Sequence, residues 1–229
     1  MSTAATARDI RRYAAEAVGT GVLVLIGPGA STVAASTGAF GHGGVAAAFG
    51  IVVSILIVAL GGTSGAHINP AVTLAFWSAR RFPSADVVPY VAAQCAGAIA
   101  AGFALRWLLG DAVSAGATLP AISLGGAFAV EFGFSAILAL VIFAVATDER
   151  VPPGLPALAI GATVMVGALV TGPLTGGSFN PARSLGPAVA SGVWTAHWLY
   201  WVAPVAGMMG GARMYAWLEP ERARAVRVG

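Results

Sequence analysis

Charged residues are scarce in this chain. They make up 9% of its 229 residues, whereas hydrophobic residues make up 58%. A soluble domain carries roughly a quarter charged residues, because water must wet its surface. The shortage of charge therefore excludes an ordinary soluble domain. It indicates a polytopic membrane protein, in which spans of about 20 apolar residues leave room for roughly six or seven helices.

Lysine is absent, so all twelve basic residues are arginines. We interpret this absence as a mark of GC-rich coding and expect a bacterial source. The arginines are dispersed along the chain. This dispersal argues against a nucleic-acid partner in spite of the formal net charge of +3.

Cysteine is nearly absent. The single cysteine, Cys95, excludes an intrachain disulfide and a metal site built from cysteines, and we expect it to fill a helix contact. The sequence also lacks a phosphate-binding loop, a cluster of metal ligands and a cofactor motif. We therefore expect no cofactor, no bound metal ion and no catalytic residue.

Long apolar stretches dominate what is present. Each can cross about 30 Å of hydrocarbon as a helix. An open strand would leave backbone groups unpaired in lipid, and no barrel-like alternation occurs. The sequence therefore predicts an all-α membrane protein with six transmembrane helices, at residues 13–36, 45–62, 86–109, 122–146, 155–173 and 197–218.

Two further segments, 61–76 and 172–189, are apolar enough to enter the membrane but are broken by glycine and proline. They are typical of re-entrant segments. Irregular backbone at that depth is tolerated only where protein or a water-filled cavity receives it. The pair therefore indicates a pore or a substrate site.

The arginines predict the orientation. With the N-terminus inside, only Arg106 and Arg183 fall on the outer side. An excess of arginine marks cytoplasmic loops, so both termini are predicted to be cytoplasmic. We expect the last three arginines of the chain to bind anionic headgroups. The ten arginines on the predicted cytoplasmic side are Arg8, Arg11, Arg12, Arg80, Arg81, Arg150, Arg213, Arg222, Arg224 and Arg227.

The two re-entrant segments repeat each other. Aligned without gaps, Asn69-Pro70-Ala71 matches Asn180-Pro181-Ala182, and each half carries one glutamate in its first span, Glu16 or Glu131. Three spans per half is an odd number, so the halves should insert with opposite topology. We expect one channel domain over 1–229, with repeats at about 8–110 and 120–220.

Each Asn-Pro pair is a helix start, because asparagine caps a helix and proline fits its first position. Two half-helices should therefore begin near the membrane midplane and present partial positive charge there. Asn69 and Asn180 would add two amide donors, and the glycine-rich carbonyls before them would act as acceptors. A file of water oriented this way could not relay protons, and the dipoles would repel cations.

These residues resemble the aquaporin (major intrinsic protein) family. The duplicated Asn-Pro-Ala boxes followed by Arg183 are the most specific part, and the likeness runs from Ala15 to Pro204. It implies a right-handed six-helix bundle with two half-helices in the cell membrane. It also implies a homotetramer with one pore per subunit. Within each half the family's glutamate, here Glu16 or Glu131, accepts hydrogen bonds from the re-entrant loop, and His67 is expected to help brace that loop.

The resemblance places the family's outer constriction at Phe49, Ala168, Gly177 and Arg183. Water-selective members usually have histidine where Ala168 stands, and often cysteine or threonine where Gly177 stands. Both differences should widen the constriction and remove a polar partner. Arg183 would hold the permeating molecule with its fixed donors and repel cations with its charge.

Other positions favour water. The resemblance to water channels rather than glycerol facilitators rests on Ser184, Ala188 and the pair Tyr200-Trp201. We therefore predict a passive water channel that excludes protons and ions. The alternative is a channel for small neutral solutes such as glycerol, ammonia, hydrogen peroxide or metalloid hydroxides.

Two hypotheses from other classes compete. Gly62-Thr63-Ser64-Gly65 matches the pattern of rhomboid-type intramembrane serine proteases, with His197 as the nominal base. However, Thr175 occupies the place of Ser64 in the second half, and a nucleophile has no reason to be duplicated. The other competitor is a purely structural junction protein.

Small residues and the remaining histidines have structural interpretations. Gly207 with Gly211, and Gly97 with Ala101, form small faces that indicate close helix packing. His42 and His197 are expected to lie near the outer surface of the membrane.

Overall fold

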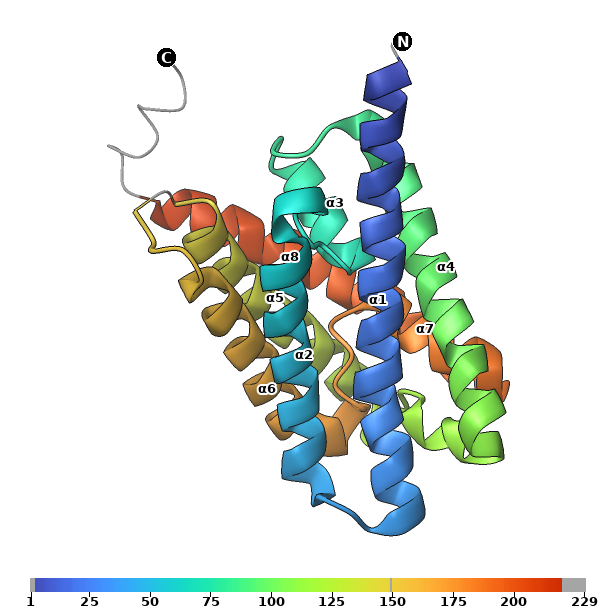
Figure 1. The fold of residues 1–229 in the computed structure, drawn as a ribbon. Helices are drawn as coiled ribbons and strands as arrows, with labels where there is room; N and C mark the ends of the chain where they lie inside the picture. The colour runs from blue at the N-terminus through green and yellow to red at the C-terminus, as the bar shows by residue number, and fades with distance from the viewer. Residues whose placement is uncertain (1–2, 149, 220–229) are drawn as a thin grey trace.

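The computed structural model describes residues 3–148 and 150–219, and the regular structure in these residues is helical (Figure 1). In this described part of the chain, six α-helices are long and two are short, with one 3-10 helix between α4 and α5. Their bounds are α1 Thr3–Thr37, α2 Gly41–Ser64, α3 Pro70–Ser78, α4 Ser84–Leu109, η1 Gly110–Gly116, α5 Leu124–Ala146, α6 Leu155–Thr175, α7 Pro181–Ser191 and α8 Leu199–Leu218.

The predicted fold class is confirmed. Six long helices cover the six predicted spans, and each Asn-Pro pair starts a short helix, α3 or α7. Within the described residues, five helices are long and apolar enough to cross a membrane: α1, α2, α4, α5 and α6. The sixth, α8, is 20 residues long but carries Arg213 and several glycines, which lower its apolar character.

Most helix ends lie within a few residues of the prediction, and two features differ more. Helix α1 begins at Thr3 rather than at residue 13, and polar residues near the predicted start are bound to α4. There Asp86 accepts hydrogen bonds from Arg12 Nη1 and from the Tyr13 hydroxyl, both at 2.9 Å. A count of apolar residues misses such an extension. The 3-10 helix η1 was also not predicted; it begins at Gly110, whose positive φ of 63° ends α4.

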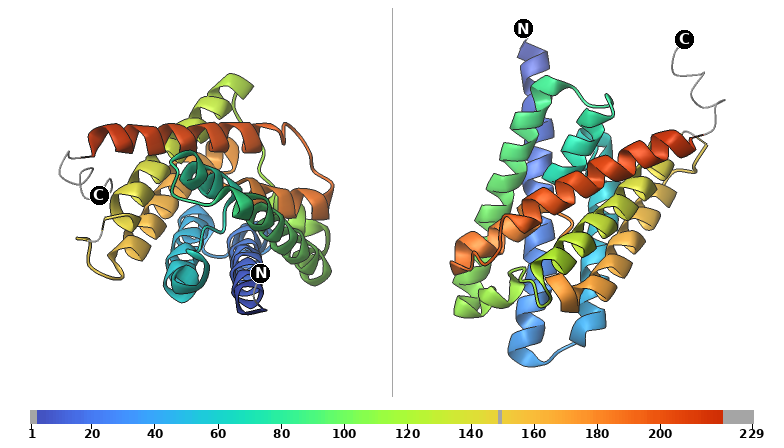
Figure 2. Two further views of the ribbon diagram at one scale, coloured as in Figure 1. Left: turned by 90° about the horizontal axis from the view of Figure 1, so that it is seen from above. Right: turned by 180° about the vertical axis from the view of Figure 1, so that it is seen from behind.

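The connections lie at two opposite ends of the bundle (Figures 1 and 2). One end holds the start of α1, the α3–α4 loop, the α5–α6 connection and the end of α8. The other holds the α1–α2 turn, η1 and the α7–α8 connection. The first end carries most of the arginines. Three arginines predicted to lie there, Arg222, Arg224 and Arg227, are outside the described residues.

The two halves of the chain pack into each other. Within the halves, α1 packs against α2 and α4, and α5 packs against α6 and α8. Between the halves, α2 packs against α6, α4 against α7 and α3 against α8. Each short helix is therefore held by a long helix of the other half.

Glycines bring the long helices into backbone contact. A Cβ on Gly97 would lie 1.9 Å from the Ala17 carbonyl oxygen of α1. A Cβ on Gly207 or Gly211 would lie 2.2 or 2.1 Å from a carbonyl oxygen of α5. The predicted close packing at these glycines is confirmed. Helices α2 and α6 meet in the same way, through Gly50 and Gly161.

We expect Gly211→Ala to destabilise the protein, because the new methyl group would collide with the α5 backbone at Ala136. Overpacking of this kind costs about 1–3 kcal/mol, which should lower the Tm by roughly 2–10 °C. Thermal unfolding in detergent measures the change. The matched control is Gly210→Ala on the same helix, where the nearest atom, Phe132 Cζ, would be 3.6 Å away. An equal Tm in the two variants would contradict this account of the α5–α8 contact.

Candidate pore and constriction

The two short helices begin at the asparagines of the repeated boxes. Asn69 caps α3, where its side-chain oxygen accepts a hydrogen bond from Ala71 N at 2.9 Å. Asn180 caps α7 and accepts from Ala182 N at 3.0 Å and Arg183 N at 3.2 Å. Both prolines stand at the first helical position, where the missing N–H is harmless. The positive ends of two helix dipoles therefore meet inside the bundle.

The same two asparagines join the halves of the chain. Asn69 Nδ2 donates to the carbonyl of Phe179 at 2.8 Å, and Asn180 Nδ2 donates to the carbonyl of Ile68 at 2.8 Å. Each side-chain amide has two N–H groups. One N–H of each asparagine is used in this crossed pair, and the other is left for a molecule in the cavity that both side chains line.

The segments leading into the boxes have unusual backbone conformations. Ala66 and Ile68 have positive φ values of 48° and 43°. At the equivalent positions of the second half, Gly177 and Phe179 have φ values of 56° and 50°. A side-chain-bearing residue in this region costs roughly 1–2 kcal/mol. Such a backbone persists only where its surroundings stabilise it.

Glu16 stabilises the first segment. Its carboxylate accepts hydrogen bonds from Ser64 Oγ at 2.7 Å, His67 N at 2.9 Å and Ile68 N at 2.6 Å. A fourth donor, Gln94 Nε2 of α4, lies at 2.7 Å. The glutamate is fully buried, and these donors take the place of water around its charge.

Glu131 has the same relation to the second segment. It accepts from Thr175 Oγ1 at 2.7 Å, Ser178 N at 2.9 Å and Phe179 N at 2.9 Å. It is also fully buried. The glutamates thus lie where the family resemblance placed them, each against the loop of its own half.

His67 contributes to this bracing through its main chain. Its backbone N–H, rather than its ring, contacts Glu16. The ring nitrogen Nδ1 lies 3.1 Å from Thr73 Oγ1, and the ring stacks on Phe76 with centroids 4.9 Å apart. Both rings line the central cavity. The ring is therefore part of the cavity wall.

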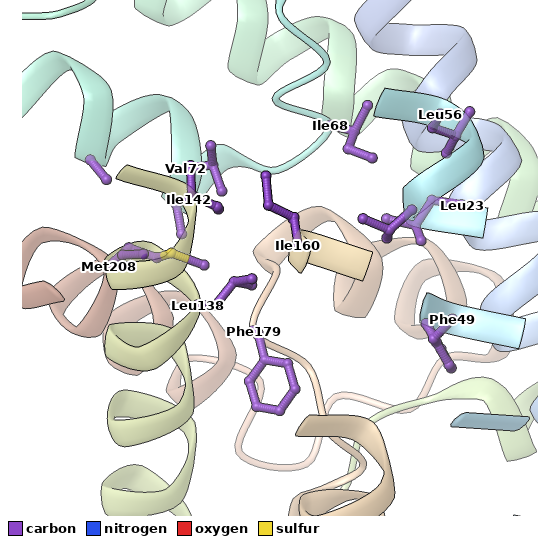
Figure 3. Close-up of a cluster of buried hydrophobic side chains, with 14 of the residues drawn as sticks. Leu23, Phe49, Leu56, Ile68, Val72, Leu138, Ile142, Ile160, Phe179 and Met208 are labelled. Atoms are coloured by element: carbon purple, nitrogen blue, oxygen red, sulfur yellow. The ribbon is translucent and has the colours of Figure 1, made fainter. Parts of the chain in front are cut away.

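A central cavity runs along the two boxes. Its volume is about 120 Å³, enough for several waters, since one needs roughly 10–15 Å³. Figure 3 shows apolar side chains from several helices around this region. Polar groups come from Asn69, Asn180 and the re-entrant segments. The apolar part of the wall includes Leu23, Val53, Val72, Leu138, Ile142, Ile160 and Val164.

A second cavity of about 250 Å³ lies beside α1, α2, α6 and η1, and Phe49 and Arg183 line both cavities. The Arg183 guanidinium carbon lies 4.7 Å from the centre of the Phe49 ring. Arg183 Nη1 donates to the carbonyl of Gly116 at 2.8 Å, and Nη2 to that of Gly176 at 3.4 Å. Within the described residues, Arg183 Nε has no hydrogen-bond partner. The wall shared by the two cavities thus holds a fixed cation with a spare donor.

The other two predicted constriction residues, Ala168 and Gly177, adjoin each other. Ala168 lines the second cavity. A Cβ on Gly177 would lie 3.4 Å from Ala168 Cα and 3.1 Å from Thr171 Oγ1. The structure therefore brings the four predicted residues into one region, two of them large and two of them small.

His42 was not predicted to contribute to the pore. It lines the second cavity, and its Nε2 lies 2.8 Å from the carbonyl oxygen of Leu169. Gly172 makes room for the ring, since a Cβ there would lie 2.6 Å from His42 Cε1. The sequence offers no signal for this contact, because it joins α2 to α6.

Two tyrosines also support the re-entrant segments. Tyr90 OH donates to the carbonyl of Ser64 at 2.8 Å, and Tyr200 OH donates to that of Thr175 at 2.7 Å. These pairs repeat, because each tyrosine follows its partner by 26 or 25 residues. Extending the repeat alignment into the third span of each half would have found them.

The geometry does not match a protease or a metal site. The Ser64 hydroxyl donates to Glu16, whereas His197 Nε2 accepts from Trp201 Nε1 at 3.2 Å, so serine and histidine are not paired. Within residues 3–148 and 150–219, no group of three or more His, Cys, Asp or Glu residues could hold a metal ion.

Comparisons with known proteins agree with this geometry. The chain is 47% identical over 206 residues to "Probable aquaporin NIP5-1" of Arabidopsis thaliana, covering 90% of this chain and 68% of that protein. It is 44% identical over 208 residues to "Aquaporin NIP1-1" of Oryza sativa subsp. japonica, covering 90% and 73%. Both relatives are plant proteins, so they lend no support to the expected bacterial source.

A solved structure and a family model complete the comparison. The fold matches the X-ray structure of the aquaglyceroporin from Plasmodium falciparum with a TM-score of 0.81 and 27% sequence identity. The match covers 96% of this chain and 100% of that chain. The family model described as "Major intrinsic protein" matches residues 3–215. The chain therefore belongs to the major intrinsic protein, or aquaporin, family of membrane channels.

Proposed function

We propose that this channel conducts small uncharged hydroxylated solutes of about the size of glycerol, together with water, and excludes protons and ions. The observation that carries the proposal is the set of residues at the proposed constriction, which consists of Phe49, Ala168, Gly177 and Arg183. Phe49 supplies an apolar wall and Arg183 supplies donors, while Ala168 and Gly177 leave space beside them. A solute with hydroxyl groups on one side and carbon on the other fits such a surface.

The residues that favoured a water channel do not line either cavity. Ser184 Oγ is hydrogen-bonded to Thr118 Oγ1 at 2.9 Å and lies close to Ser178 Oγ. Ala188 is buried, and Tyr200 binds the Thr175 carbonyl. Their positions have structural explanations, so they are poor indicators of what permeates.

The solved relative supports the wider range of solutes, because it is an aquaglyceroporin. Ammonia, hydrogen peroxide and metalloid hydroxides are also small and uncharged, and the same space would accept them. A channel for water alone is the competing proposal.

We base the proposed exclusion of protons on the side-chain amides of Asn69 and Asn180, each of which binds a carbonyl of the opposite half. A water at the midpoint of the cavity would accept the spare N–H of Asn69 and of Asn180, so its own protons would point outward. The two helix N-termini and Arg183 add positive potential along the path. Cations would therefore meet a barrier that uncharged solutes do not.

The remaining properties follow from the membrane setting. The end of the bundle that carries Arg80, Arg81, Arg150 and Arg213 is proposed to face the cytoplasm, with both termini there. The protein is proposed to be a homotetramer in the plasma membrane with one pore per subunit. The two repeats, at about 8–110 and 120–220, are proposed to form a single channel domain.

Reconstituted liposomes test the function directly. In stopped-flow light scattering with water, glycerol, urea and ammonia, we expect fast water flux with a low activation energy and glycerol uptake well above that of empty vesicles. The imposition of a proton gradient should produce no added leak. Water flux without glycerol uptake would favour the water-only channel. Flux equal to that of empty vesicles for every solute would overturn the channel proposal.

We expect Ala168→His to reduce glycerol uptake by on the order of tenfold, about 1.4 kcal/mol of barrier, while water flux is retained. The imidazole would fill the space beside Gly177 and Arg183. The matched control is Ala115→His, which adds the same ring at an exposed position of the second cavity outside the proposed constriction. Unchanged glycerol uptake in Ala168→His, or an equal loss in both variants, would show that the constriction lies elsewhere.

A further inference from the structure

A third cleft lies at the arginine-rich end of the bundle and shares no lining residue with the central cavity. Its volume is about 240 Å³, and it opens where α3 and α8 end near α5. Figure 2 (right) shows α3 lying against α8. Three arginines line it, Arg80, Arg81 and Arg213, together with Phe143 and Tyr215.

The arginines of this cleft are poorly compensated. Arg81 Nη2 lies 3.7 Å from Glu219 Oε2, which makes a single long ion pair. Arg81 Nη1 is buried and has no hydrogen-bond partner among the described residues. In the same part of the chain, neither Arg80 nor Arg213 forms an ion pair, and Arg213 Nη1 makes only a 3.5 Å contact with the Met209 carbonyl. A buried guanidinium donor without an acceptor is costly.

The Arg81 side chain is held in place by its surroundings. Its guanidinium carbon lies 5.4 Å from the centre of the Phe143 ring, and Phe143 also stacks on Phe76 at 4.7 Å. A guanidinium fixed on an aromatic face keeps its donors in one orientation. Planar, fixed donors of this kind match the oxygens of a phosphate group.

The position of the cleft agrees with a ligand at the membrane surface. Trp77 on α3 and Trp217 on α8 flank its lining residues and are 42% and 78% exposed. Exposed tryptophans concentrate at the level of the lipid headgroups. Basic pockets between transmembrane helices at that level bind the headgroups of anionic lipids.

We propose that this cleft binds a phosphate group, carried by an anionic lipid headgroup or by a soluble phosphate. Arg81 donates to the phosphate oxygens from within the cleft, and the exposed side chains of Arg80 and Arg213 add donors and charge at its rim. The site is separate from the permeation path, so it binds its ligand whatever the channel conducts.

Binding is measured on the full chain in a neutral detergent by thermal unfolding. The added probes are dioleoyl-phosphatidylglycerol, dioleoyl-phosphatidylcholine, sodium phosphate and sodium chloride. Phosphatidylglycerol should raise the Tm by about 5 °C more than phosphatidylcholine, whose choline group neutralises the phosphate. A lipid source gives this shift with phosphatidylglycerol alone. A soluble source gives it with sodium phosphate and not with sodium chloride.

The decisive variant is Arg81→Gln/Arg213→Gln, which should lose the shift. The matched control is Arg11→Gln/Arg150→Gln, which removes two charges from the same end of the bundle outside the cleft and should keep the shift. If the first variant does not fold, Arg80→Gln replaces it, because Arg80 is exposed, and it should weaken binding at least threefold. An equal shift in the cleft variants and the control, or no shift with either phosphate probe, would overturn the proposal.

Discussion

The centre of this molecule depends on the hydrogen bonds that two buried carboxylates accept from the re-entrant segments. Glu16 and Glu131 each bind two consecutive backbone N–H groups and the hydroxyl that precedes them. These bonds hold Ile68 and Phe179 at positive φ. In that conformation the carbonyl groups of both residues accept from the opposite asparagine. A buried carboxylate is stable inside the bundle only because these hydrogen-bond donors from the fold replace its water.

The resulting pore combines an apolar wall with a small number of fixed polar groups. Under the proposed function, the apolar wall binds a permeating molecule weakly, and the asparagines and Arg183 replace part of its hydration. The guanidinium of Arg183 is held in place by the backbone carbonyls of Gly116 and Gly176, which accept its hydrogen bonds. Under the proposed function, the small residues Ala168 and Gly177 set the size of the opening beside this guanidinium.

Much of this architecture was predictable from the sequence, and the reasons are local. The length of the apolar stretches predicted the spans. The two Asn-Pro-Ala boxes predicted the half-helices, because helix capping depends on adjacent residues. Features that depend on contacts between distant segments were not predictable. The contact of His42 with α6, the use of Gln94 as a fourth donor to Glu16 and the polar extension of α1 belong to this class. Ser184 and Tyr200 are weak support for the water-channel prediction, because they do not line either cavity and a residue type does not reveal which face of a helix it occupies.

The crossed asparagine bonds also have a consequence for biosynthesis. The Ile68 carbonyl finds its partner in Asn180, which follows it by 112 residues. At about 5–20 residues per second, the ribosome needs roughly 6–22 s to supply that partner. Throughout this interval the amino-terminal half stays in the translocon or the bilayer, while the Ile68 carbonyl and the Asn69 amide lack their partners from the second half. The nascent chain therefore completes its lumen only when the carboxy-terminal half is inserted, and a truncated product would be a substrate for quality-control proteases.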